Sequence, residues 1–236
     1  MRYLISLLVG MVVGAAAFLA LLYFNPLTVQ NKLSPLSVTE DELISLSYSA
    51  VATDSLIYTN DGESQVMPHP AKVLQLWEQP IRKTDAFATV LRDGRNQVAG
   101  IGLKFSSDSE STNVLNGEAI VDSVWHVYLP GRGSFFIEQQ ENYWAYLREV
   151  VVPAHWSSGD NWRGTWNGNV TSGPGALGTS RVVGGSGEFT ALESMGVESL
   201  FAKAYSVEQG PVAVTGELSI EIPRLELEVV PATPDP

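Results

Sequence analysis

The hydrophobic positions of the chain fall into one long uninterrupted run and a later series of short runs. From Leu4 to Phe24 the sequence carries no charge, and Ser6 alone interrupts its apolar, Gly and Ala composition. About 20 helical residues cross a hydrocarbon core about 30 Å thick. Asn25-Pro26 follows, and proline does not continue a helix. The pattern predicts one membrane-spanning helix in residues 1–24.

A secretory signal peptide explains the same residues. Ala15-Ala16-Ala17 has the small side chains of a cleavage site, but the apolar run continues through Phe24. The apolar region of a signal peptide is usually about 7–15 residues long, so the length favours an uncleaved anchor. Gly10 and Gly14 have the small-residue spacing of paired membrane helices, which allows a homo-oligomer. Glycine is also simply common in membrane helices.

The charges on either side of the apolar run predict its orientation. Arg2 precedes the run, whereas Glu40, Asp41 and Glu42 follow it. Positive charge tends to stay on the cytoplasmic side of a membrane. We therefore expect a single-pass protein with a cytoplasmic N-terminus and its main domain in the periplasm or outside the cell.

Short apolar runs separated by turn residues fill the rest of the chain. Pro130-Gly131-Arg132-Gly133 has the composition of a turn, and residues 212–222 alternate apolar with polar side chains as a half-buried strand does. Residues 70–83 are expected to hold a helical turn or two. The predicted strands cover residues 43–58, 87–91, 98–105, 117–129, 134–140, 143–152, 162–171, 179–183, 187–192, 196–205 and 212–222.

Antiparallel strands with short turns predict a sandwich or a barrel. Glycines inside the strands, such as Gly100, Gly102 and Gly216, permit the coiling that closes a barrel. The expected fold class is therefore all-β, a closed antiparallel barrel of about eight strands preceded by one transmembrane helix. The expected boundaries are 1–24 for the anchor, 25–40 for a linker, 41–222 for the barrel, and 223–236 for an edge strand and proline-rich tail.

One glycine-rich bend has a counterpart in known families. Gly184-Gly185-Ser186-Gly187-Glu188-Phe189 resembles the Gly-Gly-Thr-Gly-x-Phe turn of the allene oxide cyclase and dirigent barrels, with serine in place of threonine. Those proteins are eight-stranded antiparallel barrels around an apolar cavity. The resemblance covers residues 117–222 and implies a calycin-type barrel in which Gly184, Gly185, Gly187 and Phe189 form a structural bend. It transfers no catalytic residue to this chain.

Charge and cysteine content restrict the partners and the chemistry. All 26 acidic residues lie beyond the apolar run, against 13 of the 14 basic ones, because Arg2 precedes it. A domain this acidic is repelled by phosphate backbones, so nucleic acid is not an expected partner. The chain has no cysteine, which removes disulfides and thiol catalysis.

Residue types typical of metal or catalytic sites are scattered along the chain. His69, His126 and His155 are far apart, whereas zinc ligands commonly come in closely spaced pairs, so we expect no metal and no cofactor. Gly185-Ser186-Gly187 is too short for the elbow of a serine hydrolase. Paired carboxylates could arise if acids from different strands converge, although solvated faces explain these acids as well. The acids in question are Glu138, Glu141, Glu149 and Glu188.

Aromatic residues crowd between Trp125 and Trp166. Burial in a core explains most of them, because aromatic side chains bury large areas. Trp156, Trp162 and Trp166 differ, since they lie among Ser, Gly, Asp and Asn residues typical of loops or strand ends. We predict these three tryptophans at the rim of a ligand pocket.

These features predict a membrane-anchored extracytoplasmic β-barrel that binds a small apolar ligand or an envelope partner, with no evident catalysis and no assigned catalytic residue. Two alternatives stay open. One is an isomerase or cyclase of the allene oxide cyclase or dirigent type. The other is a structural envelope protein.

Overall fold

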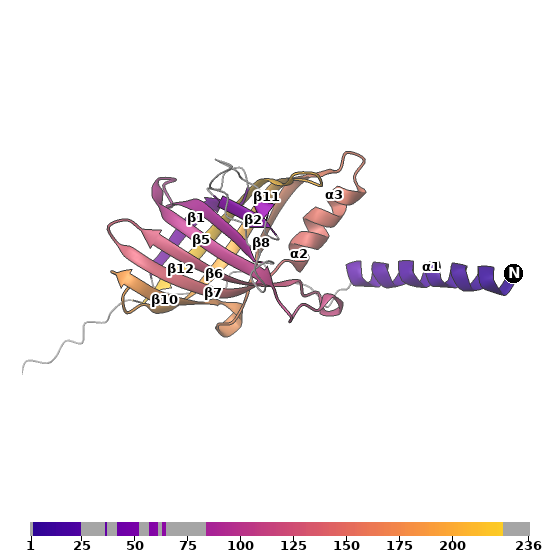
Figure 1. Ribbon diagram of the computed structural model, residues 1–236, viewed down its shortest axis with the longest axis horizontal. Helices are drawn as coiled ribbons and strands as arrows, with labels where there is room; N and C mark the ends of the chain where they lie inside the picture. The colour runs from indigo at the N-terminus through magenta and orange to yellow at the C-terminus, as the bar shows by residue number, and fades with distance from the viewer. Residues whose placement is uncertain are drawn as a thin grey trace, which may run out of the picture.

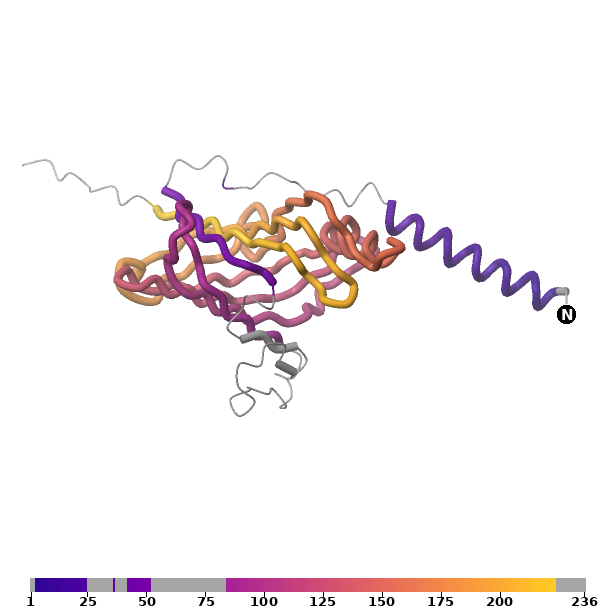
Figure 2. Tube along the Cα trace, turned by 90° about the horizontal axis from the view of Figure 1, so that it is seen from above, coloured from indigo at the N-terminus to yellow at the C-terminus, as the bar shows by residue number. Residues whose placement is uncertain are grey.

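The computed structural model describes residues 2–24, 36, 42–51, 57–60, 63–64 and 84–223, which form a β-sheet domain preceded by one helix (Figure 1). The helix, α1, spans Arg2–Tyr23 and extends away from one end of the domain (Figure 2). From Tyr3 to Tyr23 it is exposed and is long and apolar enough to cross a membrane or to serve as a signal sequence. The features expected at 25–40 lie outside the described residues apart from Leu36, as do those at 70–83 and 224–236.

The strands of the domain coincide closely with the alternating runs of the sequence. Short helical turns, η6 at Val114–Asn116 and η8 at Ala176–Gly178, lie in two of the connections. The strands are β1 Glu42–Ser49, β2 Ile57–Asn60, β3 Glu63–Ser64, β4 Asp85–Arg92, β5 Val98–Asp108, β6 Ile120–Leu129, β7 Gly133–Asn142, β8 Asn161–Asn169, β9 Thr171–Gly173, β10 Ser180–Gly187, β11 Glu193–Ser206 and β12 Gly210–Ile222.

Eight of these strands pair into a ring. Hydrogen-bonded neighbours follow the order β1-β12-β11-β10-β7-β6-β5-β4, and a pair between Ser47 of β1 and Arg92 of β4 returns to the start. Every pairing in the ring is antiparallel. Outside this circuit, β8 pairs with β11, β9 with β7, and β2 with β4 and β3.

Strand alternation sends every second side chain into the ring, where two apolar clusters form. The first cluster surrounds Trp125, Phe135 and Ile137, together with Phe189 from the glycine-rich bend. The second cluster surrounds Trp166, Leu200 and Val214 and is completed by a helical stretch between β7 and β8. Polar side chains occupy the interior between residues of the two clusters, as described below.

The helical stretch replaces a strand expected over 143–152. Residues 144–156, hereafter the 144–156 segment, comprise α2 (Trp144–Tyr146), the π-helical turn η7 (Leu147–Val151) and α3 (Val152–Trp156). Tyr146, Val150 and Ala154 recur every fourth residue and are buried, which is a helical period rather than a strand period. The Asn142 side chain accepts a hydrogen bond from the Trp144 amide at 2.9 Å, where the chain enters the first helical turn. Packing of the buried face outweighs the β-branched composition of this run.

The glycine-rich bend is a turn rather than the start of a strand. β10 ends at Gly187, which has a φ of +65°, and β11 begins only at Glu193. The register between β10 and β7 shifts between Gly184 and Ser186, so the strand carries a bulge there. The turn folds Phe189 back so that it is buried and its ring lies 5.0 Å from that of Phe135.

Replacement of Gly184 should destabilise this bend. A Cβ atom at Gly184 would overlap the carbonyl oxygen of Phe189, a backbone atom that cannot move independently. We expect Gly184→Ala to lower the free energy of unfolding by about 3 kcal/mol, the upper part of the usual overpacking range. Urea unfolding measures the change. Gly94→Ala is the matched control because nothing lies within 4 Å of its added methyl group; equal stability losses in the two variants would contradict the assignment.

Candidate functional site

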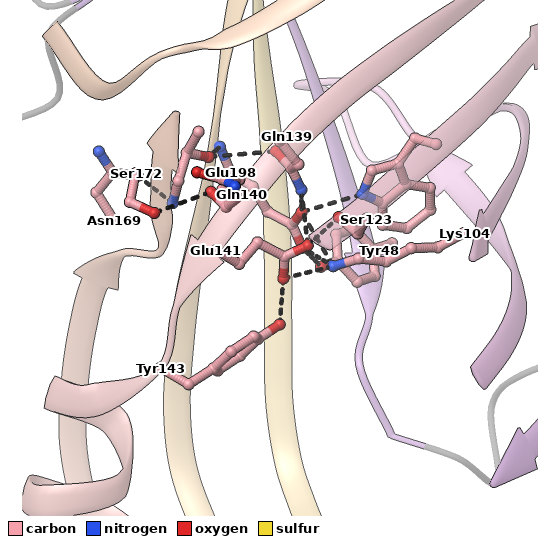
Figure 3. A network of polar contacts seen from close by, with 12 residues as sticks. Tyr48, Lys104, Ser123, Gln139, Gln140, Glu141, Tyr143, Asn169, Ser172 and Glu198 are labelled. Carbon is pink, nitrogen blue, oxygen red and sulfur yellow. Dashed lines mark hydrogen bonds and ion pairs between the residues drawn. The ribbon is translucent and has the colours of Figure 1, made fainter. Parts of the chain in front are cut away.

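A row of polar side chains enters the interior of the ring at one level. On β7 the inward positions are Phe135 and Ile137 and then Gln139 and Glu141, so the strand changes from apolar to polar along its buried face. Neighbouring strands add inward polar groups at the same level (Figure 3). The resulting polar network consists of Tyr48, Lys104, Ser123, Trp125, Gln139, Glu141, Tyr143, Thr171 and Glu198.

Glu198 of β11 is fully buried and receives hydrogen bonds from four side chains. Lys104 Nζ lies 3.0 and 3.1 Å from its two carboxylate oxygens, and Trp125 Nε1 donates at 3.0 Å. The Tyr48 hydroxyl and the Gln139 amide donate as well. A buried carboxylate must be paired and hydrogen-bonded to remain charged, and Glu198 meets that condition.

Glu141 of β7 is equally buried and shares the same lysine. Lys104 Nζ lies 2.8 Å from Glu141 Oε2, and Gln139 Nε2 donates to Glu141 Oε1 at 3.0 Å. Ser123 and Tyr143 donate their hydroxyl hydrogens to the same carboxylate. With both acids ionised, one lysine balances two carboxylates and leaves the network with a formal charge of about −1.

Two strand glycines make room for the aromatic donors of the network. A Cβ atom at Gly102 would lie 2.8 Å from the Trp125 ring, and one at Gly216 would overlap the Tyr48 ring. The rings therefore lie directly against the backbone of β5 and β12. Interior glycine thus has a packing role here, because it lets an indole and a phenol reach the Glu198 carboxylate.

The network holds its ions in their charged forms. Burial alone would lower the pKa of Lys104, but the Glu141 and Glu198 carboxylates outweigh burial and raise it. Burial alone would raise the pKa of Glu198, but Lys104 and the hydrogen bonds from Tyr48 and Trp125 lower it. Burial, reinforced by Glu198, raises the pKa of the Tyr48 hydroxyl. Both shifts favour the charged forms, an ammonium group on Lys104 and a carboxylate on Glu198.

Sequence reasoning identified one member of this network as a candidate acid. Glu141 lies inside the ring, whereas Glu138 pairs with Arg181 on the outer surface and Glu188 with Arg132 at a turn. Glu149 pairs with Arg148 and accepts a hydrogen bond from Trp166 Nε1 at 3.0 Å. Lys104 and Glu198 were not singled out from the sequence. Each lies two residues from a buried neighbour on the same strand face, Gly102 for Lys104 and Leu200 for Glu198, and this alternation is the signal that could have identified them.

An apolar groove lies outside the ring, between the end of α1 and the 144–156 segment. Its volume is about 720 Å³, within the range of ligand pockets. The groove is lined by Ala16, Leu19, Ala20, Leu22, Tyr23, Phe24, Trp144, Leu147, Arg148, Val151, Val152, His155 and Trp156. The rings of Tyr23 and Trp156 lie 5.5 Å apart across it. His155 places its Nδ1 atom 2.9 Å from the Val151 carbonyl oxygen.

The three tryptophans predicted at a pocket rim occupy different places. Trp156 is 74 % exposed and lines the apolar groove. Trp166 is buried in the second apolar cluster, where its ring lies 5.3 Å from that of Tyr146, and Trp162 packs against the same cluster. The structure therefore places Trp156 at a groove and separates it from the other two.

The outer face of the ring is unusually apolar for a solvated sheet. A second hollow, of about 350 Å³, is lined by Phe105 and Val124 of this face and also by Ser123 and Gln139 of the polar network. His126 stacks on Phe136 there with ring centres 4.6 Å apart, and His69 lies outside the described residues. The exposed apolar residues on neighbouring strands β5, β6, β7 and β10 include Ile101, Phe105, Val124, Tyr128, Phe136 and Val183. In the described part of the chain no group of three or more His, Asp or Glu side chains is placed to hold a metal ion.

Known proteins give little guidance to this site. No protein-family model and no curated protein matches the chain. Among solved structures, the chain is similar to the Diels Alderase AbmU from Streptomyces koyangensis, at 10 % identity and a TM-score of 0.37, over 80 % of this chain and 72 % of that one. It is also similar to a nonspecific heme-binding cyclase that catalyses a 4 + 2 cycloaddition in neoabyssomicin biosynthesis, at 12 % identity and a TM-score of 0.38, over 79 % and 70 % of the two chains. The site is therefore interpreted from its own residues.

Removal of the shared lysine should be costly. Lys104→Met leaves Glu141 and Glu198 buried without a cation, and breaking one side of a buried ion pair costs about 3–5 kcal/mol. Arg181→Met is the control, because it removes an exposed ion pair to Glu138 that contributes less than about 1 kcal/mol. Urea unfolding of both variants checks the difference, and comparable losses would mean that the network contributes no more than a surface pair.

The pKa shifts also predict how stability depends on pH. The pKa of Glu198 is lowered from 4.5, so its stabilising contribution is complete above pH 4.5 and is lost as the pH falls through the folded-state value. The pKa of Lys104 is raised from 10.5, so its contribution is complete below pH 10.5 and is lost as the pH rises through the folded-state value. In urea titrations, Glu198→Gln should show a shallower fall of stability on the acid side than the unmodified protein. An unchanged acid-side slope would count against the ionised Glu198.

Proposed function

We propose that this protein is a membrane-anchored, extracytoplasmic β-barrel protein that binds one small apolar or amphiphilic molecule at its membrane-proximal end. In this proposal α1 is an uncleaved anchor with its N-terminus in the cytoplasm, and the ring of strands is a closed barrel in the periplasm or outside the cell. Membrane and ligand are its partners, and nucleic acid is not. The apolar groove between α1 and the 144–156 segment is the observation that carries the proposal.

Three properties of the groove support ligand binding. Its volume of about 720 Å³ fits a molecule of lipid or drug size. Its walls are almost entirely aliphatic and aromatic, while Arg148 and His155 supply polar groups at the edge. One wall, from Ala16 to Phe24, belongs to the apolar helix itself, so a molecule dissolved in the bilayer can reach the groove without crossing water.

The resemblance to the allene oxide cyclase and dirigent barrels remains part of the proposal. The ring of eight antiparallel strands and the bend with Gly184, Gly187 and buried Phe189 support it. An isomerase or cyclase activity gains less support. Such a role would favour a buried carboxylate of raised pKa beside a cavity, whereas the pKa of Glu198 is lowered and its oxygens are occupied by donors of the chain itself.

A structural envelope role is the second candidate, and the apolar outer face of β5, β6, β7 and β10 favours it. Phe105, Val124 and Phe136 are exposed on adjacent strands, where a solvated sheet would carry polar side chains. A contiguous exposed apolar patch commonly marks a contact with another protein. Pairing through Gly10 and Gly14 of α1 would be a further route to association.

Photo-crosslinking tests the ligand site in the full-length protein held in detergent micelles. A fatty acid carrying a diazirine group should label peptides from the 144–156 segment and the end of α1. Ala20→Phe places a ring inside the groove and should lower labelling at least several-fold, because it removes most of the space for an acyl chain. The intact mass of the protein isolated from membranes should include residues 1–24, as an uncleaved anchor requires.

Ala17→Phe is the matched control, because Ala17 lies on the same helix but does not line the groove. Labelling that is equally strong in both variants would refute the groove as the binding site. Loss of residues 1–24 from the isolated protein would remove one wall of the groove and the anchor together.

A further inference from the structure

The 144–156 segment has two apolar faces, although a surface helix of a water-soluble domain needs one. Its inward face is buried: Tyr146 and Val150 belong to the second apolar cluster, and Ala154 is fully buried. The other side carries Leu147 and Val152, which line the groove together with the two terminal tryptophans of the segment, Trp144 and Trp156. Val151 lies between the two faces, since it lines the groove and also packs against the second cluster. A second apolar face of this kind requires a second apolar environment, either protein or lipid.

The same face is continuous with the end of α1. Tyr23 and Phe24 close the apolar run of that helix, and the Tyr23 ring contacts Trp156 of the segment at 5.5 Å. Tyrosine and tryptophan collect at the level of the head groups in membrane proteins, because their rings have an apolar body and a polar tip. Trp156 is therefore brought to the depth at which the anchor leaves the hydrocarbon core.

Charge in the groove agrees with that position. Arg148 and His155 are the basic residues that line the groove. The neighbouring acid, Glu149, does not line it: one carboxylate oxygen lies 2.8 Å from Arg148 Nη2, and the other accepts a hydrogen bond from Trp166 Nε1 at 3.0 Å. In a protein with a net charge of −12, a groove lined by an arginine and a histidine with no acidic residue suits contact with phosphate head groups.

We propose that the 144–156 segment is a second membrane contact: its outer face lies in the head-group layer, and bilayer lipid fills the groove between it and α1. This inference rests on the proposed anchor and deepens the proposed ligand site, since it makes the bound molecule a membrane amphiphile that enters sideways from the bilayer. The domain is thereby held at the bilayer surface by two elements, α1 and the 144–156 segment. Trp144 and Trp156 are the aromatic residues that hold the segment at the interface.

The lack of cysteine makes this contact measurable one position at a time. Val152→Cys and, separately, Trp156→Cys are spin-labelled in the full-length protein reconstituted in phosphatidylcholine vesicles. Oxygen concentrates in hydrocarbon and a water-soluble nickel chelate stays outside, so their relative effects on the label report depth. We expect both positions to be several-fold more accessible to oxygen, relative to the nickel chelate, than Arg95→Cys in the exposed turn at the opposite end of the ring.

Each other outcome overturns the inference. Accessibility to the nickel chelate equal to that of the Arg95→Cys label would mean that the segment lies in water. Protection from both reagents would mean that protein covers the groove, either the ring itself or a second copy of the chain. Trp156→Cys replaces an exposed side chain, so it reports on the bilayer even if Val152→Cys perturbs the fold. If fatty-acid labelling in micelles fails while the depth measurement is positive, the ligand site is refuted and the membrane contact is not.

Discussion

The rest of the structure depends on one constraint: two carboxylates, those of Glu141 and Glu198, are buried inside the ring and share one lysine, Lys104. Removing three charges from water is unfavourable, and their mutual attraction compensates only if the remaining hydrogen-bonding capacity is satisfied. Here the donors come from β1, β5, β6 and β7, and the acceptors from β7 and β11. A shift of one residue in any of these strands would turn its polar side chain outward and leave a buried charge without its partner. The network therefore selects one register for most of the ring.

This arrangement also explains where open space occurs. Trp125 and Tyr48, which belong to the first apolar cluster and also donate to Glu198, fill the interior where they lie against Gly102 and Gly216. The larger of the two hollows described above lies outside the ring, where α1 meets the 144–156 segment. The buried ions thus occupy the interior of the ring, and the larger apolar hollow lies at its edge.

Much of the fold follows from local patterns, and the exceptions have physical causes. The alternating runs predicted strands that overlap β4 to β8 and β10 to β12, because a half-buried strand has a period of two. Residues 143–152 were predicted as a strand, since Val150 to Val152 favour strands locally, whereas the helical segment found there depends on burying Tyr146 and Val150 in the second apolar cluster. Glu141 was recognised as a candidate acid, but its partners Lys104 and Glu198 are 94 residues apart in sequence and meet only through ring closure. Trp156 is exposed, whereas β8 turns Trp166 into the second apolar cluster, although both tryptophans have polar neighbours in the sequence.

The strands of the ring are not all joined by the same number of residue pairs. β1 and β12 are matched over eight residue pairs, whereas β1 and β4 meet through Ser47 and Arg92. Because the free energy of local opening grows with the number of contacts that must be broken, we expect the β1–β4 pairing to open before the other strand pairings of the ring. Brief separation there would admit solvent to the side of the interior formed by Tyr48 and Phe87 while the rest of the circuit stays intact.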